Sequence, residues 1–166
     1  METPISEYLG KELIFKKKHF LKRLYELKFD DVILCQMEII NPFTMRAIVK
    51  GFTKDDVEFY KTSLWSREIN IKYSNNMLPF ASYKGQLFNL WGTIFLPGGE
   101  QLFIKYDLFG LKYELKDNFN ETLILLKSDL FFPSAKIQIL KKSPVVDKYP
   151  WLIALLFYII LKRRSR

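Results

Sequence analysis

Cysteine and histidine are almost absent from this chain, and each scarcity excludes a class of chemistry. The single cysteine, Cys35, excludes an internal disulfide and the zinc clusters that several thiolates would hold. Its aliphatic neighbours predict a small buried side chain and not a reactive thiolate. The single histidine, His19, follows a run of lysines that is expected on the surface. A serine or cysteine nucleophile would therefore lack the imidazole base that such a mechanism requires.

Nucleotide-binding and metal-binding motifs are also missing. No glycine-rich phosphate loop is present, and Pro97-Gly98-Gly99-Glu100 is typical of a hairpin turn. The acidic pairs Asp30-Asp31 and Asp55-Asp56 lie in expected turns, where aspartate bonds to nearby backbone. A hydrolase with two carboxylates stays open at this stage, because their separation in space cannot be derived from sequence. We predict no catalytic residue, no metal and no cofactor, and hence a protein that is not an enzyme.

Apolar and basic residues are abundant instead. Hydrophobic residues make up 49% of the 166 residues, enough to build one core, so a single domain over residues 1–166 is expected. The net charge of +8 predicts attraction to phosphate-bearing partners, although solubility alone would also account for it. The first residues lack the basic and apolar start of a secretory signal. We therefore expect a cytoplasmic protein, either free or peripheral at a membrane.

Alternation of apolar and polar residues dominates the chain. In Glu68–Tyr73, residues Ile69, Ile71 and Tyr73 share one side of a strand and polar residues share the other. About a dozen such segments between residues 12 and 141, at roughly 8 to 12 residue intervals, predict a mostly β, closed antiparallel barrel. The other segments are Leu13–Lys17, Leu21–Phe29, Val32–Glu38, Arg46–Phe52, Val57–Leu64, Leu87–Leu96, Gln101–Asp107, Leu111–Lys116, Thr122–Lys127 and Ala135–Ile139.

One short sequence occurs twice in the predicted strands. Tyr25-Glu26-Leu27-Lys28 recurs as Tyr113-Glu114-Leu115-Lys116, and each copy is followed by a turn, an aliphatic strand and a proline. Either a β unit has been duplicated, or an amphipathic strand sequence has arisen twice by composition. The matching order of turn, strand and proline favours duplication.

The segment after the strands predicts a short helix with no polar face. Pro150 begins it, Trp151–Leu161 is wholly apolar, and the basic tail 162–166 follows. A helix without a polar face lies inside protein or inside lipid. The apolar run reaches only about 16 Å, roughly half the hydrocarbon thickness of a bilayer. We therefore favour a buried helix over residues 150–162 that runs through the centre of the barrel, with a C-terminal membrane anchor as the alternative.

A closed barrel of about twelve strands around a hydrophobic C-terminal helix resembles the tubby C-terminal domain and its relatives, the phospholipid scramblases and the LURP-one-related proteins. The strand series Leu13–Leu140, the repeated Y-E-L-K and the helix Trp151–Leu161 carry this resemblance, which covers nearly the whole chain. Small bacterial tubby-like proteins are the nearest analogues. The resemblance implies binding of phosphoinositides or association with membrane lipid.

Clusters of basic residues are the candidate binding site. We expect a non-catalytic module that uses them to bind anionic lipid headgroups or other phosphate ligands. A protein-interaction barrel is the alternative. Nucleic acid is the weaker candidate, because the neighbouring aromatics Phe15, Phe20 and Tyr25 are expected in the core and would not stack on bases. The chosen residues are Lys16, Lys17, Lys18, Lys22, Arg23, Lys141 and Lys142.

Overall fold

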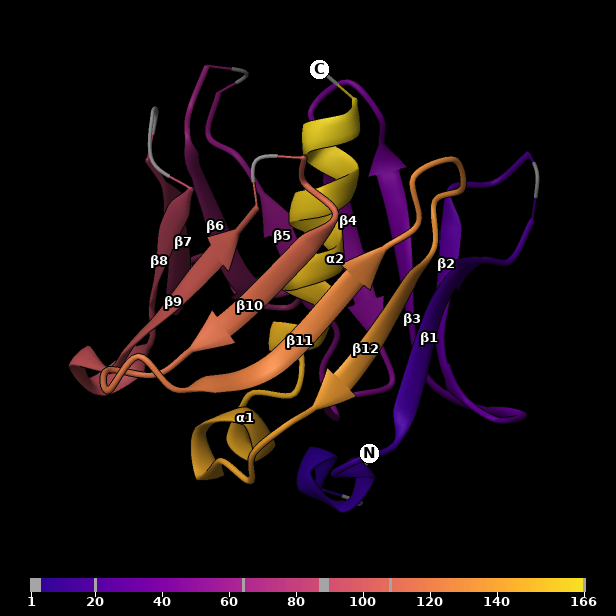
Figure 1. Cartoon of the computed structure of the whole chain (residues 1–166). Coiled ribbons are helices and arrows are strands. Elements are labelled where there is room, and N and C mark those ends of the chain that lie inside the picture. Colours follow the sequence, from indigo (N-terminus) through magenta and orange to yellow (C-terminus); the bar gives the residue numbers. More distant parts are fainter. Residues whose placement is uncertain (1–3, 20, 64, 87–89, 108, 166) are drawn as a thin grey trace.

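The chain folds into a closed β-barrel. The computed structural model describes residues 4–19, 21–63, 65–86, 90–107 and 109–165. Within them, twelve antiparallel strands each pair with their neighbours in the chain, and β1 pairs with β12 to close the barrel (Figure 1). The prediction of a mostly β, closed antiparallel barrel is confirmed. The strands are β1 (Glu12–Lys17), β2 (Leu24–Phe29), β3 (Val32–Asn41), β4 (Arg46–Lys50), β5 (Val57–Tyr60), β6 (Glu68–Tyr73), β7 (Ala81–Gly85), β8 (Trp91–Phe95), β9 (Gln101–Tyr106), β10 (Lys112–Lys116), β11 (Thr122–Ser128) and β12 (Ala135–Ile139).

Alternate side chains of each strand form the lining of the barrel. In β1, Leu13 and Phe15 are fully buried, whereas Ile14 and Lys16 are exposed. This is the period of two that the sequence predicts. Because the sheet closes on itself, each described strand has a partner on both sides, which removes the open edges at which sheets aggregate.

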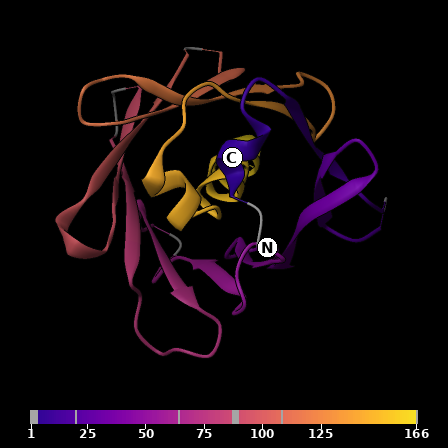
Figure 2. The ribbon, with the colours of Figure 1, turned by 90° about the horizontal axis from the view of Figure 1, so that it is seen from below.

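The helix α2 (Leu152–Arg164) runs lengthwise through the barrel (Figures 1 and 2). Every residue from Leu152 to Leu161 is buried. Phe157 stacks on Phe15 of β1 with ring centroids 4.5 Å apart, and Tyr158 lies against Phe59 of β5 at 5.4 Å. Aromatic contacts on two sides fix the rotation of the helix. The prediction of a helix in the barrel centre is confirmed, shifted by two residues from 150–162.

Two short helices lie at the mouth of the barrel where α2 begins (Figure 2). They are the 3-10 helix η1 (Ile5–Tyr8) and α1 (Pro144–Lys148). The backbone N–H and the hydroxyl of Ser6 donate hydrogen bonds to the Asp147 carboxylate at 2.8 and 2.7 Å. The start of the described chain is thereby tied to the connection between β12 and α2. A further 3-10 turn, η2 (Pro97–Gly99), joins β8 to β9 where a hairpin turn is expected.

The strand β7 and the helix α1 are absent from the sequence prediction. β7 reads Ala-Ser-Tyr-Lys-Gly, whose small residues have weak strand propensity. Its one bulky inward residue, Tyr83, lies over Gly92 of the neighbouring strand, where an added Cβ would come 2.3 Å from the tyrosine side chain. Packing against a glycine therefore stabilises this strand. In α1, the Ser143 hydroxyl accepts a hydrogen bond from the N–H of Val146, and Pro144 occupies the first turn, both recognised start signals.

Candidate functional site

The two ends of the barrel differ in chemistry. The upper end, named for its position in Figure 1, consists of the loops β1–β2, β3–β4, β5–β6, β7–β8, β9–β10 and β11–β12 together with the last turn of α2. The lower end consists of the remaining loops with η1 and α1. Connecting loops are where binding residues concentrate in β-barrels, because the strands hold them rigidly in place.

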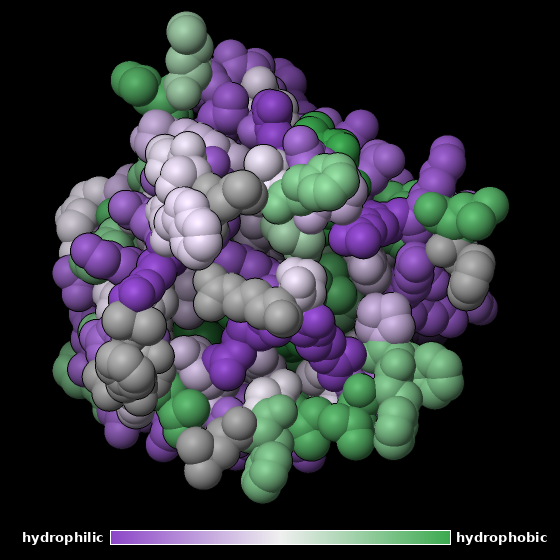
Figure 3. Space-filling model, turned by 90° about the horizontal axis from the view of Figure 1, so that it is seen from above, coloured by the Kyte–Doolittle hydropathy of each residue, from purple (hydrophilic) through white to green (hydrophobic). Residues whose placement is uncertain are grey.

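Large apolar side chains project into solvent from loop after loop of the upper end. Five of them, here called the apolar tips, are between 83% and 93% exposed. Figure 3 shows hydrophobic side chains at separate points around the edge of this face, with hydrophilic ones between them. Isolated exposed hydrophobics are common, but their recurrence on successive loops makes this face the candidate for an interaction surface. The apolar tips are Leu21, Phe43, Trp65, Phe109 and Phe131.

Side-chain caps hold four of the loops that carry the tips. Asn41 accepts hydrogen bonds from the N–H groups of Phe43 and Thr44 at 3.0 and 3.1 Å. Asp129 accepts from Phe131 and Phe132 at 2.9 and 3.1 Å, and these donors lower the pKa of its carboxyl group. Such turns fix the backbone of a loop, so the apolar side chains are displayed by ordered structure.

The β9–β10 and β5–β6 loops are capped in the same way. Asp107 accepts hydrogen bonds from the N–H groups of Leu111 and Lys112, and the Ser63 hydroxyl accepts from the N–H of Ser66. The carboxylates of Asp107 and Asp129 therefore accept hydrogen bonds from backbone N–H groups of their own loops.

Basic residues surround the apolar tips. Five of the seven predicted binding residues, Lys16, Lys17, Lys18, Lys22 and Arg23, lie on the β1–β2 hairpin at the upper end, and all but the half-buried Lys17 are exposed. Lys18 also forms an ion pair with the buried Glu26 at 2.7 Å. The sequence predicts a strand that begins at Leu21, but β2 begins at Leu24 and residues 21–23 belong to this loop. The upper end further carries Lys61, Arg67, Lys84, Lys112, Lys127, Lys162, Arg163 and Arg164.

The other two predicted residues lie elsewhere. The register between β1 and β12 pairs Glu12 with Gln138 and Phe15 with Ala135, so the chain beyond β12 reaches the lower end. Lys141 and Lys142 follow there, and Lys141 is paired with Glu121. The predicted clusters therefore form two separate surfaces at opposite ends of the barrel. Only the β1–β2 cluster lies near the apolar tips.

The lower end also exposes apolar side chains, among them Met77, Leu78 and Phe119. Its charge is different, because acidic residues predominate in its loops. Phe119, for example, lies between Asp117 and Glu121. Exposed apolar residues thus coincide with an excess of positive charge at the upper end alone, within the part of the chain described. The acidic residues of the lower end are Glu7, Asp30, Asp31, Asp55, Asp56, Glu100, Asp117, Glu121 and Asp147.

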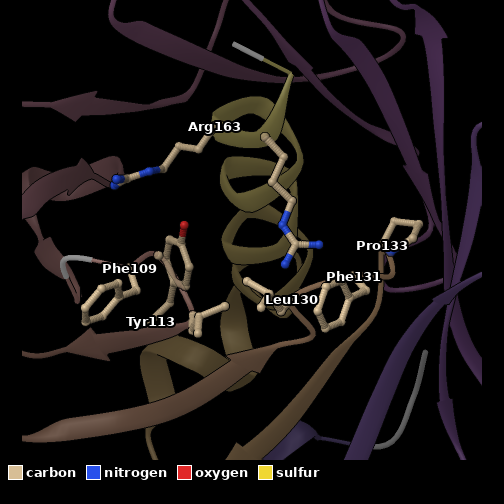
Figure 4. Close-up of a pocket in the computed structure, with 9 residues that line it drawn as sticks. Phe109, Tyr113, Leu130, Phe131, Pro133 and Arg163 are labelled. Atoms are coloured by element: carbon tan, nitrogen blue, oxygen red, sulfur yellow. The ribbon is translucent and has the colours of Figure 1, made fainter.

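A pocket of about 550 Å³ opens at the upper end between the β9–β10 and β11–β12 loops. Figure 4 shows Phe109 and Phe131 on opposite sides of it, with Tyr113 between them and Arg163 reaching out from α2. Burial raises the pKa of the Tyr113 phenol, an effect that the charge of Arg163 opposes. The remaining lining residues are Gly110, Leu111, Leu130, Pro133 and Arg164.

The two arginines of the pocket differ in their contacts. Arg164 donates hydrogen bonds to the Phe132 carbonyl at 2.9 Å, to the Ser128 hydroxyl at 2.6 Å and to the Asp129 carbonyl. The Arg163 guanidinium lies over the ring of Tyr106 at 3.9 Å from its centroid. Among the residues that the structure describes, neither guanidinium forms an ion pair with a carboxylate. Both charges are therefore held in place by neutral groups.

The apolar tips recur with a regular period along the sequence. Leu21, Trp65 and Phe109 are spaced 44 residues apart, and Phe43 and Phe131 are two such periods apart. The strands β2, β6 and β10 begin with the same spacing, at Leu24, Glu68 and Lys112. The barrel thus consists of three successive units, β1–β4, β5–β8 and β9–β12.

The repeated Y-E-L-K marks the first and third of these units. The middle copy is Ile69-Asn70-Ile71-Lys72, which shares only its lysine with Y-E-L-K and differs at the other three positions. In the first and third units the pairing with the next strand shifts register at the same point, between Leu27 and Lys28 and between Leu115 and Lys116. The two Y-E-L-K segments that suggest a duplication are therefore the first and third copies of a threefold repeat. A search at fixed spacing would have found it from sequence.

The other residues considered for chemistry are placed as expected. Cys35 is 1% exposed, and burial raises the pKa of its thiol well above the usual value. His19 is exposed, and Asp30 adopts a left-handed turn conformation with φ of 49°.

Over the described ranges, no three histidine, cysteine or acidic side chains gather as a metal-binding group. None of the helices in those ranges combines the length and apolarity needed to cross a bilayer.

Comparison with known proteins adds no relative. No family model matches the chain, and neither a curated protein nor a solved structure matches it. The function is therefore argued from the geometry of the upper end.

Proposed function

We propose that this chain is a non-catalytic module that binds an anionic membrane surface with the upper end of its barrel. The observation that carries this proposal is the coincidence of ordered, exposed apolar tips with basic residues on the same face. Apolar side chains enter the boundary between headgroups and acyl chains, while lysine and arginine remain at the phosphates. Peripheral attachment to a membrane and membership of the tubby-like family are part of the same proposal.

The arrangement of the tips favours a flat partner. They come from separate loops around the barrel end, and each one stands beside basic residues of its own or a neighbouring loop. A bilayer can receive all of these side chains together, each in contact with the same phosphate layer. Aromatic residues such as Trp65 are the side chains most characteristic of that layer.

Single-stranded nucleic acid and an acidic protein are the competing partners. Exposed aromatics between basic residues also suit base stacking. Base stacking requires the aromatics to follow a groove along the nucleic-acid strand, however. The tips instead come from separate loops around the barrel end, and they include the aliphatic Leu21. Lipid accounts for aliphatic and aromatic tips alike.

Flotation with liposomes tests the proposal. The full chain is expected to bind vesicles of mixed phosphatidylcholine and phosphatidylserine at low salt, and to bind phosphatidylcholine alone far more weakly. Trp65→Ser is expected to weaken binding about tenfold, because a large aromatic surface no longer leaves water. Phe119→Ser removes an equally exposed aromatic from the lower end and is the matched control.

Equal effects of Trp65→Ser and Phe119→Ser would contradict the proposal, as would equal binding to both kinds of vesicle. A parallel titration with fluorescent single-stranded DNA distinguishes the competing partner. If Trp65→Ser weakened DNA binding and left vesicle binding unchanged, the upper end would be a nucleic-acid surface. Thermal unfolding of each variant shows whether the barrel is intact.

A further inference from the structure

We infer that the pocket between the β9–β10 and β11–β12 loops is a binding site for one anionic amphiphile, a molecule with a phosphate or carboxylate head and an apolar chain. This site is distinct from the general attraction of the upper end to a charged surface. It predicts a stoichiometric complex with a single monomeric ligand. The inference would hold even if the protein did not bind bilayers.

The residues that line the pocket can bind both the anionic head and the apolar chain of such a ligand. Phe109 and Phe131 form apolar walls on opposite sides, and Arg163 and Arg164 bring positive charge to the same space. None of the Arg163 N–H groups donates a hydrogen bond to a described residue, although its plane is held over Tyr106. A guanidinium held in place with its donors unused is well suited to bind a phosphate or carboxylate oxygen.

The Tyr113 hydroxyl adds a polar group to the same space. It lies between the apolar walls in Figure 4, and it donates no hydrogen bond to another described residue. Phenol and guanidinium donors together match an oxygen-rich anionic head. The carbonyl groups at the end of α2 carry partial negative charge, which the basic side chains of its last turn offset.

Comparison of the three units singles out this pocket. The first unit carries an equivalent pair of apolar tips, Leu21 and Phe43, at the same positions of its loops. Among the residues that the structure describes, the ring contact of Arg163 and the hydrogen bonds of Arg164 are made with the third unit, where Arg163 lies on Tyr106 of β9 and Arg164 bonds the β11–β12 loop. The single central helix thus breaks the threefold pattern. In the third unit, the tips Phe109 and Phe131 line the same pocket as Arg163 and Arg164. Apolar walls beside fixed positive charge are what a specific site for an anionic amphiphile requires.

Calorimetric titration of the full chain with three probes tests the inference. Octyl phosphate has both an anionic head and a chain, octanol lacks the charge, and inorganic phosphate lacks the chain. Octyl phosphate is expected to bind with a stoichiometry of one and at least about tenfold more tightly than either other probe. Inorganic phosphate binding as tightly as octyl phosphate would show a simple anion site and overturn the inference.

Matched variants assign the binding to the pocket. Arg163→Gln and Phe109→Ser are each expected to weaken octyl phosphate binding about tenfold. Lys22→Gln and Leu21→Ser, which change a charge and an equivalent tip in the first unit, are expected to leave it unchanged. Equal losses in both sets would overturn the inference, because they would indicate unspecific attraction to the upper end.

Liposome flotation of the same variants separates this inference from the proposed function. Leu21→Ser and Phe109→Ser are expected to reduce vesicle binding to a similar extent, since both tips enter the bilayer. Loss of octyl phosphate binding in Phe109→Ser alone supports the pocket, whatever the flotation result. Vesicle binding without any saturable binding of octyl phosphate would overturn the pocket and leave the membrane proposal intact.

Discussion

Glutamate side chains on the outer face of the barrel are enclosed by lysine and arginine. Glu26 of β2 is 3% exposed, although it points away from the core. Lys18 and Lys28 contact its carboxylate at 2.7 and 3.0 Å, and Gln36 donates a hydrogen bond at 2.9 Å. Burial alone would raise the pKa of Glu26, but the donors outweigh it and lower the pKa from 4.5 to about 2. Glu58 and Glu114 are enclosed in the same manner.

The lowered pKa of Glu26 predicts a loss of stability in acid. A carboxyl group with a lower pKa in the folded state stabilises the fold above its unfolded pKa, and the contribution is lost as pH falls from about 4.5 to about 2. Urea unfolding at a series of pH values should show that Glu26→Gln is less dependent on pH over this range, by about 1–2 kcal/mol after allowance for solvent screening.

Glu68→Gln is the control for this measurement. Its carboxylate is exposed at the start of β6 and forms no ion pair with any described residue. Its unfolding should follow the pH dependence of the unmodified chain. An unchanged pH dependence in Glu26→Gln would show that the enclosed carboxylate contributes nothing to stability in acid.

At the scale of elements, α2 is the core of the barrel. Its residues from Leu152 to Leu161 are buried on all sides, and the strands supply the surface that surrounds them. A charge placed there would have no partner, and its burial is among the most destabilising of substitutions. We expect Ile153→Asp to destabilise the domain by about 4 kcal/mol or more, with Ile153→Val costing about 1 kcal/mol.

A chain shortened to end at Tyr149 is expected to lose cooperative unfolding, because the lining of the strands would have nothing to pack against. Circular dichroism during thermal and urea unfolding measures both effects. A shortened chain that unfolds as cooperatively as the full one would show that the strands form a core without α2. Ile153→Val reports on the cost of a small cavity and serves as the reference for Ile153→Asp.

At the scale of the whole molecule, charge is divided along the barrel axis. The basic residues gather with the apolar tips at the upper end, and acidic residues outnumber basic ones in the loops of the lower end. The net charge of +8 is a sum over the whole chain and does not reveal that the two ends differ in charge. The molecule is expected to meet a negatively charged surface with its upper end foremost, since attraction there is opposed by repulsion at the other end.

Neutralising charge at either end tests this orientation. The triple substitution Lys16→Gln, Lys22→Gln and Arg23→Gln should weaken binding to anionic vesicles by about 1 kcal/mol per charge at low salt. The double substitution Lys141→Gln and Lys142→Gln should leave binding unchanged. Flotation at increasing salt should reduce the difference between the two, because exposed charges are screened. Equal weakening by both sets would contradict the orientation.

Most of the fold could be predicted from local sequence. Alternation located nearly all of the strands, and an apolar run too short for a bilayer located the helix in the barrel centre. β7 was missed because its stability comes from Tyr83 packing over Gly92, which only the paired strands bring together. α1 was missed although its start signals are present in Ser143 and Pro144.

The candidate site was only partly predictable. The basic residues near Lys16 were identified, but whether they join Lys141 depends on strand register, which sequence alone does not determine. The apolar tips were assigned to strands or passed over, because a leucine or tryptophan beside a strand is ordinarily core. Their regular spacing was the available signal. The pocket depends on where α2 ends relative to the β11–β12 loop, a consequence of packing.

The order of elements along the chain has a consequence for biosynthesis. A ribosome delivers all of the strands before α2, although α2 is what their inner faces pack against. Until α2 is synthesised, the inward-facing apolar side chains of the strands have no helix to pack against. The sheet also cannot close before β12 is available to pair with β1. Folding during translation is therefore expected to stall as an open, aggregation-prone sheet. Chaperones that recognise such sheets would act on this protein chiefly while it is still attached to the ribosome.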